Sequence, residues 1–217
     1  MSLRVAVEVA PKKAFASALD WPGWSRGAKA PDDALQVLLD YAPRYASVAK
    51  RAKVAFSPPR TRRGIEVVER LSGGGGTEFG VPSVATSAED DSIDGRELKR
   101  LIALLEAAWA TFDAAAKKAK GVSLSLGPRG GGRQVPKIIE HVREAEAAYL
   151  HQLGMKVAEH TMAELRRDFA EALRALAEGR PLARPNKVHR PWGPRYAVRR
   201  SAWHALDHAW EIEDRSP

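Results

Sequence analysis

Near the end of the 217-residue chain runs the stretch Trp203-His204-Ala205-Leu206-Asp207-His208-Ala209-Trp210-Glu211-Ile212-Glu213-Asp214-Arg215. Neither Gly nor Pro interrupts residues 195–216, so we predict a helix here. His204 and His208 stand four residues apart, which places both imidazoles on one face of that helix, one turn apart. Two neutral imidazoles in this arrangement can bind one divalent transition metal ion. Because a His is more often a hydrogen-bonded core or surface residue, the pair alone leaves both interpretations open.

A third ligand on another helix would complete a metal site. His141 is the candidate, because it lies in a second predicted helix, Val135 to Leu153. Three imidazoles without a thiolate suit Zn, Ni, Fe or Mn, and they leave one coordination position for water or a substrate. Glu144, three residues after His141, is a candidate to orient that imidazole or to accept a proton.

Glu211 lies on the same helix face as the two histidines, seven residues after His204 and three after His208. It is a candidate fourth ligand or general base. The simpler interpretation is a salt bridge to Arg215, four residues further along the helix.

Other side chains of this helix indicate packing. Asp207 is offset from the histidine face, and we expect it to accept a hydrogen bond from an arginine of a neighbouring helix or loop. Trp203 and Trp210, seven residues apart, form a stripe that is typical of core packing.

A Gly-rich loop, Gly127-Pro128-Arg129-Gly130-Gly131-Gly132-Arg133-Gln134, precedes the His141 helix. Glycines let backbone N–H groups approach an anion, and the two arginines add donors for phosphate or carboxylate. Arg129 and Arg133 are therefore candidate contacts to an acidic substrate or cofactor, and a plain flexible connector is the alternative. No Gly-Lys-Ser/Thr follows, so the loop is not a Walker motif.

The composition is typical of a globular protein in water, with 44% hydrophobic and 29% charged residues. No apolar run reaches the ~18 residues that span a bilayer, so we expect no membrane partner. Residues 1–8 carry charges within a short apolar run and do not read as a signal peptide. Without cysteine there is no disulfide, thiolate ligand or cysteine nucleophile, and the cytoplasm is the default location.

A net charge of +8 raises the question of nucleic acid as a partner. The excess is concentrated in Lys50-Arg51-Ala52-Lys53, in Arg60-Thr61-Arg62-Arg63, in the Gly-rich loop and between Arg180 and Arg200. Such clusters are often only a solvated face, and 27 acidic residues argue against a dedicated nucleic-acid arm. A metal-free module that binds nucleic acid or protein stays as the alternative function.

Residues 1–86 predict a small α+β lobe. We expect strands at Leu3 to Val9, Ala14 to Leu19 and Ile65 to Leu71, a helix from Pro31 to about Tyr45, and a return strand from Thr77 to Thr86. Trp21-Pro22-Gly23, Arg26-Gly27 and Asp32-Asp33-Ala34 resemble the HicB domain, in which a β-hairpin with a Pro-Gly turn precedes a helix. The resemblance covers about the first 50 residues, and no toxin-neutralising role follows from it.

Residues 94–217 predict a four-helix bundle after a polar linker. The expected helices are 94–119, 135–153, 161–178 and 195–216. Asp94 and Glu97 form the capping-box pattern at the start of the first of these helices. The predicted fold class is therefore α+β: a β-hairpin and helix lobe followed by a bundle.

The histidine contexts, Glu140-His141-Val142-Arg143-Glu144-Ala145-Glu146 and Trp203 to Glu211, resemble the DinB-like superfamily of four-helix-bundle metalloproteins. The resemblance covers roughly residues 94–217. It implies His141, His204 and His208 as ligands of a divalent metal, most often Zn or Ni. It also implies a metal-dependent transferase, for thiol transfer, or a hydrolase acting on a small anionic or thiol-bearing substrate, and a homodimer. The N-terminal lobe departs from the minimal family bundle, as does the lack of a helix beyond the histidine pair.

Overall fold

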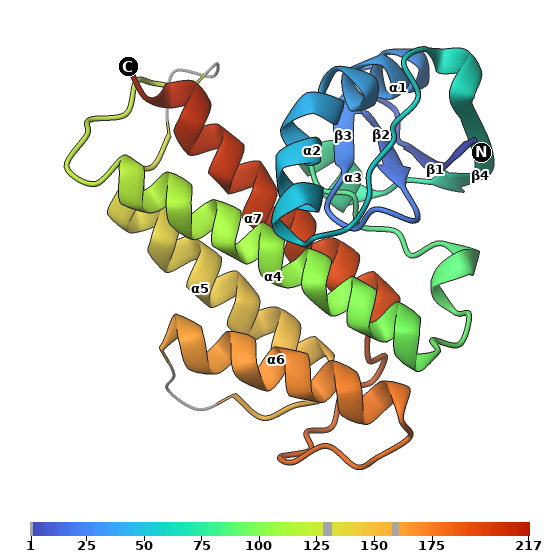
Figure 1. Ribbon diagram of the computed structural model, residues 1–217, viewed down its shortest axis with the longest axis vertical. Coiled ribbons are helices and arrows are strands. Elements are labelled where there is room, and N and C mark those ends of the chain that lie inside the picture. Colours follow the sequence, from blue (N-terminus) through green and yellow to red (C-terminus); the bar gives the residue numbers. More distant parts are fainter. Residues whose placement is uncertain (1, 128–131, 158–160) are drawn as a thin grey trace.

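A computed structural model describes residues 2–127, 132–157 and 161–217 (Figure 1). It is a mixed α+β fold, as the sequence predicts. The elements in chain order are β1 (Leu3–Val9), β2 (Ala14–Ala18), β3 (Ser25–Ala28), α1 (Pro31–Asp40), α2 (Ala42–Arg51), β4 (Ile65–Ser72), α3 (Gly75–Phe79), α4 (Gly95–Lys118), α5 (Val135–Gln152), α6 (Met162–Ala177) and α7 (Pro194–Arg215). None of the helices in the described part of the chain combines the length and apolar character needed to cross a membrane.

The four described strands form one sheet in the order β3-β2-β1-β4. β1 and β2 make the expected antiparallel hairpin, and β4 lies parallel to β1 because the two-helix connection carries the chain back across the sheet. β3 overlaps the stretch Asp20 to Gly27, for which Pro22-Gly23 predicts a turn and no strand. Its strand character is hidden because Ser25-Arg26-Gly27-Ala28 has no apolar alternation, and it forms by pairing with β2.

The single helix predicted after Pro31 is wrong, because the chain turns at Tyr41 and forms two helices. Pro43 explains the break, since proline has no N–H to donate to the preceding turn and is tolerated in the first turn of a new helix. The Tyr45 hydroxyl donates to Pro22 O at 2.8 Å, and Trp24 Nε1 donates to Leu38 O at 2.8 Å. These bonds fix both helices against the Pro-Gly turn.

The predicted return strand from Thr77 to Thr86 is also wrong. The segment begins inside α3 and then runs as an irregular chain over the sheet. The reason is Glu8, a buried carboxylate of β1 that accepts the backbone N–H groups of Ser83 and Val84 and the Thr77 hydroxyl. Because a side chain takes the N–H groups that a strand would pair, no ladder forms here.

Four helices lie in the described part of the second half of the chain, with bounds within one or two residues of those predicted. α7 packs along α4 and against α5, and α6 contacts α4, α5 and α7. The Asp94 side chain accepts from the Glu97 N–H at 2.7 Å, so the predicted cap of α4 is confirmed. In Figure 1, α7 lies between α4 and the sheet-bearing lobe.

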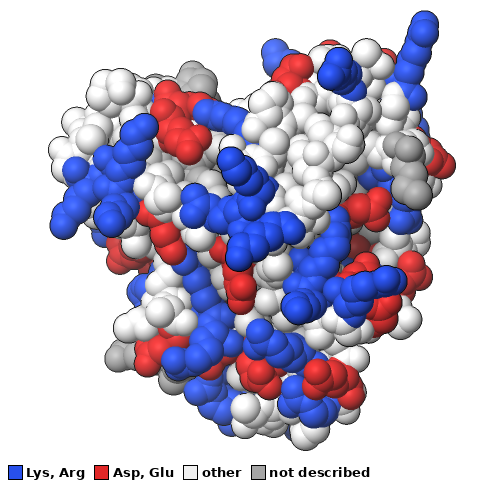
Figure 2. Space-filling model, viewed as in Figure 1, with Lys and Arg blue, Asp and Glu red and all other residues white. Residues whose placement is uncertain are grey.

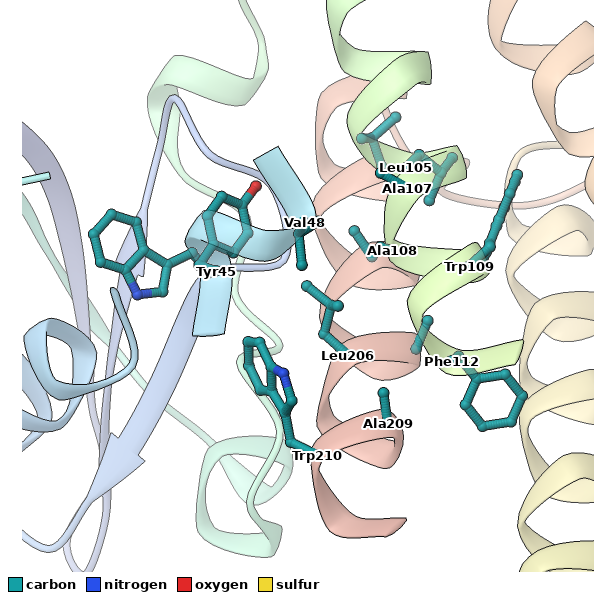
Figure 3. Close-up of a cluster of buried hydrophobic side chains, with 14 of the residues drawn as sticks. Tyr45, Val48, Leu105, Ala107, Ala108, Trp109, Phe112, Leu206, Ala209 and Trp210 are labelled. Carbon is teal, nitrogen blue, oxygen red and sulfur yellow. The ribbon is translucent and has the colours of Figure 1, made fainter. Parts of the chain in front are cut away.

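The lobe and the helices share one continuous hydrophobic core. Figure 3 shows Tyr45 and Val48 of α2, Leu206 and Trp210 of α7, and a row of α4 side chains ending at Phe112 in the same cluster. Gly23 lies so close to α7 that a Cβ there would be 2.9 Å from a leucine methyl carbon. The lobe therefore holds the outer face of α7, the helix that carries two of the three candidate ligands.

Candidate metal centre

Three histidines meet where α5 packs against α7. His141 comes from α5, His204 and His208 come from α7, and one ring nitrogen of each lies within 4.8 Å of the others. Nε2 of His141 and Nε2 of His204 are 3.3 Å apart. Two ligands of a tetrahedral zinc ion with Zn–N bonds of about 2.0–2.1 Å have about this separation. The donor set and this spacing fit a divalent transition metal.

Burial sets the charge of these imidazoles. His204 is buried, and His141 and His208 are half-buried. Burial, then the charges of His208 and His141, hold the pKa of His204 well below its ordinary value of 6.5. Burial, then the charges of His208 and Arg133, lower the pKa of His141. Both imidazoles are therefore neutral at pH 7, which is the protonation state that binds metal.

Glu211 fixes the orientation of His208. The two are 2.7 Å apart, from His208 Nδ1 to Glu211 Oε2. Burial acts to raise the pKa of Glu211, but the hydrogen bond and charge of His208, together with Arg215, outweigh it and lower that pKa. An ionised carboxylate can only accept, so Nδ1 carries the proton and the lone pair of His208 is on Nε2. Metal-binding histidines commonly make this second contact to a carboxylate.

The predicted salt bridge between Glu211 and Arg215 is also present, at 2.5 Å. Buried Arg215 further donates through Nε to Ser125 O at 2.8 Å, and its own carbonyl accepts from the Ser125 N–H. Gly132 packs on the same guanidinium, because a Cβ there would lie 2.6 Å from Arg215 Nη2. Ser125, two residues before the Gly-rich loop, and Gly132 within it are thus both held against Arg215, which binds the carboxylate that orients His208.

The remaining predicted site residues lie at the rim. Glu144 is exposed and near enough for its charge to act against the lowering of the His141 pKa. Arg133 is exposed, and its charge contributes to lowering the pKa of both His141 and His204. Arg129 lies outside the described residues. The centre thus has a carboxylate and a guanidinium close to its solvent side.

Two neighbours of His204 are not singled out by the sequence patterns. The Tyr149 ring of α5 lies 5.8 Å from the His204 ring, and buried Arg200 donates to the Tyr149 hydroxyl at 3.3 Å. The available signal is the spacing of α7, because Arg200 precedes His204 by four residues and so shares its helix face. A third feature, Glu146 of α5, is buried and binds Arg166 of α6 through two guanidinium nitrogens.

The opposite face of α7 packs on the lobe. Arg26 donates to Asp207 at 3.0 Å, so the predicted arginine partner is confirmed, but it lies on strand β3 and not on a helix or loop. Trp203 is buried against Phe15 and Trp210 against Tyr41, with ring centroids 6.2 and 5.1 Å apart. Both tryptophans are core residues.

Surface charge is mixed on the face that Figure 2 shows. Lys and Arg side chains gather across its middle, with Asp and Glu patches set among them. Several basic groups near the core are already paired, such as Arg166 with Asp113 and Glu146, and Arg195 with Glu97.

Comparison of the chain with protein-family models, curated proteins and solved structures finds no match.

Proposed function

We propose that the chain is a divalent-transition-metal protein with a DinB-like four-helix bundle and a HicB-like N-terminal lobe. We propose that it catalyses thiol transfer to a small molecule or hydrolysis of one. The observation that carries this proposal is the convergence of one nitrogen from each of His141, His204 and His208 within 4.8 Å. It is supported by the order of the helices and by the carboxylate behind His208.

In this proposal each residue has a defined task. The three histidines hold the ion, Zn or Ni by preference and Fe or Mn as alternatives, and Glu211 keeps His208 in the tautomer that binds. The ion acts as a Lewis acid that favours the ionised form of water or of a thiol. Glu144 is exposed beside His141, where it can accept a proton and pass it to solvent. Arg133 is placed to attract an anionic substrate.

Elemental analysis of protein purified without a His tag tests the metal directly. We expect close to one metal ion per chain in the wild type and loss of that ion in the His204→Ala/His208→Ala double variant. His189→Ala is the matched control, because His189 is exposed in the connection before α7 and should leave the metal content unchanged. A wild type that takes up neither Zn, Ni nor Mn on incubation would contradict the metal proposal. A metal-bearing protein should then be screened for thiol-transfer and hydrolytic reactions.

The second candidate function is a metal-free nucleic-acid or protein-binding module. It is favoured by the net charge of +8 and by the gathering of Lys and Arg side chains on the face in Figure 2. Binding of DNA or RNA through phosphate contacts should weaken steeply as salt increases. Salt-dependent affinity combined with no bound metal would favour this function over the first.

A further inference from the structure

Three arginines are buried within the described residues, and all three lie on α7. Arg199 binds Glu89 through Nε at 2.6 Å and Nη2 at 3.0 Å, and also the carbonyl oxygen of Val84. Arg215 binds Glu211 and Ser125 O. In both cases a carboxylate compensates the buried charge, which is the usual requirement for taking a guanidinium out of water.

Arg200 is the exception among these three. It is only 7% exposed, yet no carboxylate binds it in the described part of the chain. Its Nη2 donates to the Tyr149 hydroxyl, while Nε and Nη1 have no acceptor. The guanidinium carbon lies 5.1 Å from the Trp203 ring centre and 5.4 Å from that of Tyr149. These rings stabilise the cation, but they accept no hydrogen bond in its plane, so Nε and Nη1 stay without an acceptor. Because these two nitrogens lie on opposite edges of the guanidinium, a carboxylate is bound by one of them together with the second N–H of Nη2.

The position of Arg200 relates this fork to the candidate metal centre. Arg200 and His204 are one helical turn apart on the same face of α7, about 6 Å along the axis. The Tyr149 ring contacts both residues, since its centre is 5.8 Å from the His204 ring. The Tyr149 ring is therefore a shared neighbour of the guanidinium and of one of the three histidines. Arg200 is buried next to the candidate metal centre, and two of its nitrogens have no acceptor. This combination is more typical of a residue that binds a ligand than of one that only packs.

We propose that Arg200 binds the carboxylate of a small organic acid whose thiol or hydroxyl group reaches the metal held by the three histidines. The substrate class is thus a thiol or hydroxy acid with a short apolar spacer that packs on Tyr149. Planar bidentate recognition of carboxylate is the task for which arginine is best suited. Because Nε and Nη1 are enclosed, binding of the acid as proposed requires the half-buried Tyr149 ring to move. The metal-reaching half of this proposal rests on the proposed function, and the carboxylate half does not.

The test compares two thiols with the same carbon chain, 4-mercaptobutyrate, which ends in a carboxylate, and 4-mercaptobutan-1-ol, which ends in an uncharged hydroxyl group. Isothermal titration into the zinc-loaded full chain should give a lower Kd for the acid by about 10-fold or more, the size of one charge-assisted hydrogen bond. Arg200→Met should remove this preference and leave the Kd of the alcohol within about twofold, because the alcohol binds through the thiol alone. Arg200→Lys keeps the charge without the fork and should keep part of the preference.

Arg133→Met separates this proposal from the expectation that Arg133 contacts the acidic substrate. Loss of the preference in Arg133→Met, with retention in Arg200→Met, would overturn the proposal, as would equal affinity of the wild type for both probes. Circular dichroism establishes that each variant is folded, and Arg200→Gln replaces Arg200→Met if the latter is not.

A metal-independent measurement keeps the two proposals distinguishable. The Arg200 Nε–H signal can be assigned in a ¹⁵N spectrum of the metal-free protein by its absence from Arg200→Met. We expect butyrate to shift this signal and butan-1-ol to leave it in place. If neither thiol binds zinc-treated protein but butyrate shifts the signal, the metal proposal fails and the carboxylate site stands. If butyrate leaves the signal unmoved, the carboxylate site fails.

Discussion

Replacing Glu211 by alanine tests whether this carboxylate positions a metal ligand. In the structure Glu211 accepts from His208 Nδ1 at 2.7 Å and from Arg215 at 2.5 Å, so it joins the ligand to the end of the Gly-rich loop. Without the carboxylate, His208 can rotate and can adopt the tautomer with the proton on Nε2, which cannot bind metal through Nε2. We therefore expect Glu211→Ala to keep the fold and to bind metal more weakly.

The expected loss is about 10- to 100-fold in metal affinity, or about 1.4–2.8 kcal/mol, which is the usual effect of removing a carboxylate behind a ligating histidine. Glu211→Gln should fall between the alanine variant and the wild type. Its amide oxygen can still accept from His208, but the charge is lost and its N–H₂ group faces the Arg215 donors. Glu144→Ala is the matched control, because Glu144 is an exposed carboxylate near His141 and affects it only through charge.

Competition with a chromophoric zinc chelator at pH 7.5 gives the Kd of each variant on one scale. The expected order of affinity is wild type and Glu144→Ala together, then Glu211→Gln, then Glu211→Ala. Unchanged affinity in Glu211→Ala would refute the positioning role. An equal loss in Glu144→Ala would show that general negative charge, and not the His208 hydrogen bond, supports the metal.

Three further outcomes follow from the structure. The metal-free protein should lose stability in urea as pH falls through about 6.5, because burial lowers the pKa of His204 and the unfolded chain then binds more protons; a flat profile would contradict this. Arg199→Met should cost about 3–5 kcal/mol in urea unfolding by leaving Glu89 buried and unpaired, whereas Arg62→Met, at an exposed pair, should cost less than about 1 kcal/mol. Gly23→Ala should lower thermal stability by about 1–3 kcal/mol, because Gly23 has φ +90° and its Cβ would press on α7; wild-type stability would refute that contact.

The helices of the second half could be predicted because their signals are local. The residues of each apolar stripe lie on one helix, and the caps are local as well, such as Asp94 at α4 and Thr161, which accepts from the Glu164 N–H at α6. The N-terminal lobe is harder to predict than these helices, because β3 and the chain after α3 take their conformation from partners far away in the sequence. Glu8 shows why: its carboxylate binds backbone groups about 75 residues further along, and no local pattern contains that information.

In the candidate site, too, some features follow from local spacing and others depend on tertiary packing. Helical spacing predicts that His204, His208 and Glu211 share a face, and the structure places them so. That His141 meets them depends on how α5 packs on α7, and here the order and context of the histidines indicated the pairing. The unpaired state of Arg200 could not be predicted, because whether a buried arginine finds a carboxylate depends on every neighbouring element at once.

The lobe gives α7 a second constraint that a bare bundle would not have. Trp203, Asp207 and Trp210 face β2, β3 and the α1–α2 junction, while Arg200, His204 and His208 face α5. Rotation of α7 by even a fraction of a turn would therefore cost packing and an ion pair on one side as it moved the histidines on the other. A ligand set must be held to well within an ångström to select a metal, and two histidines on one helix share any error in its rotation. Clamping that helix from behind removes this shared error, which gives the N-terminal lobe a physical role at the candidate centre without any contact to the ion.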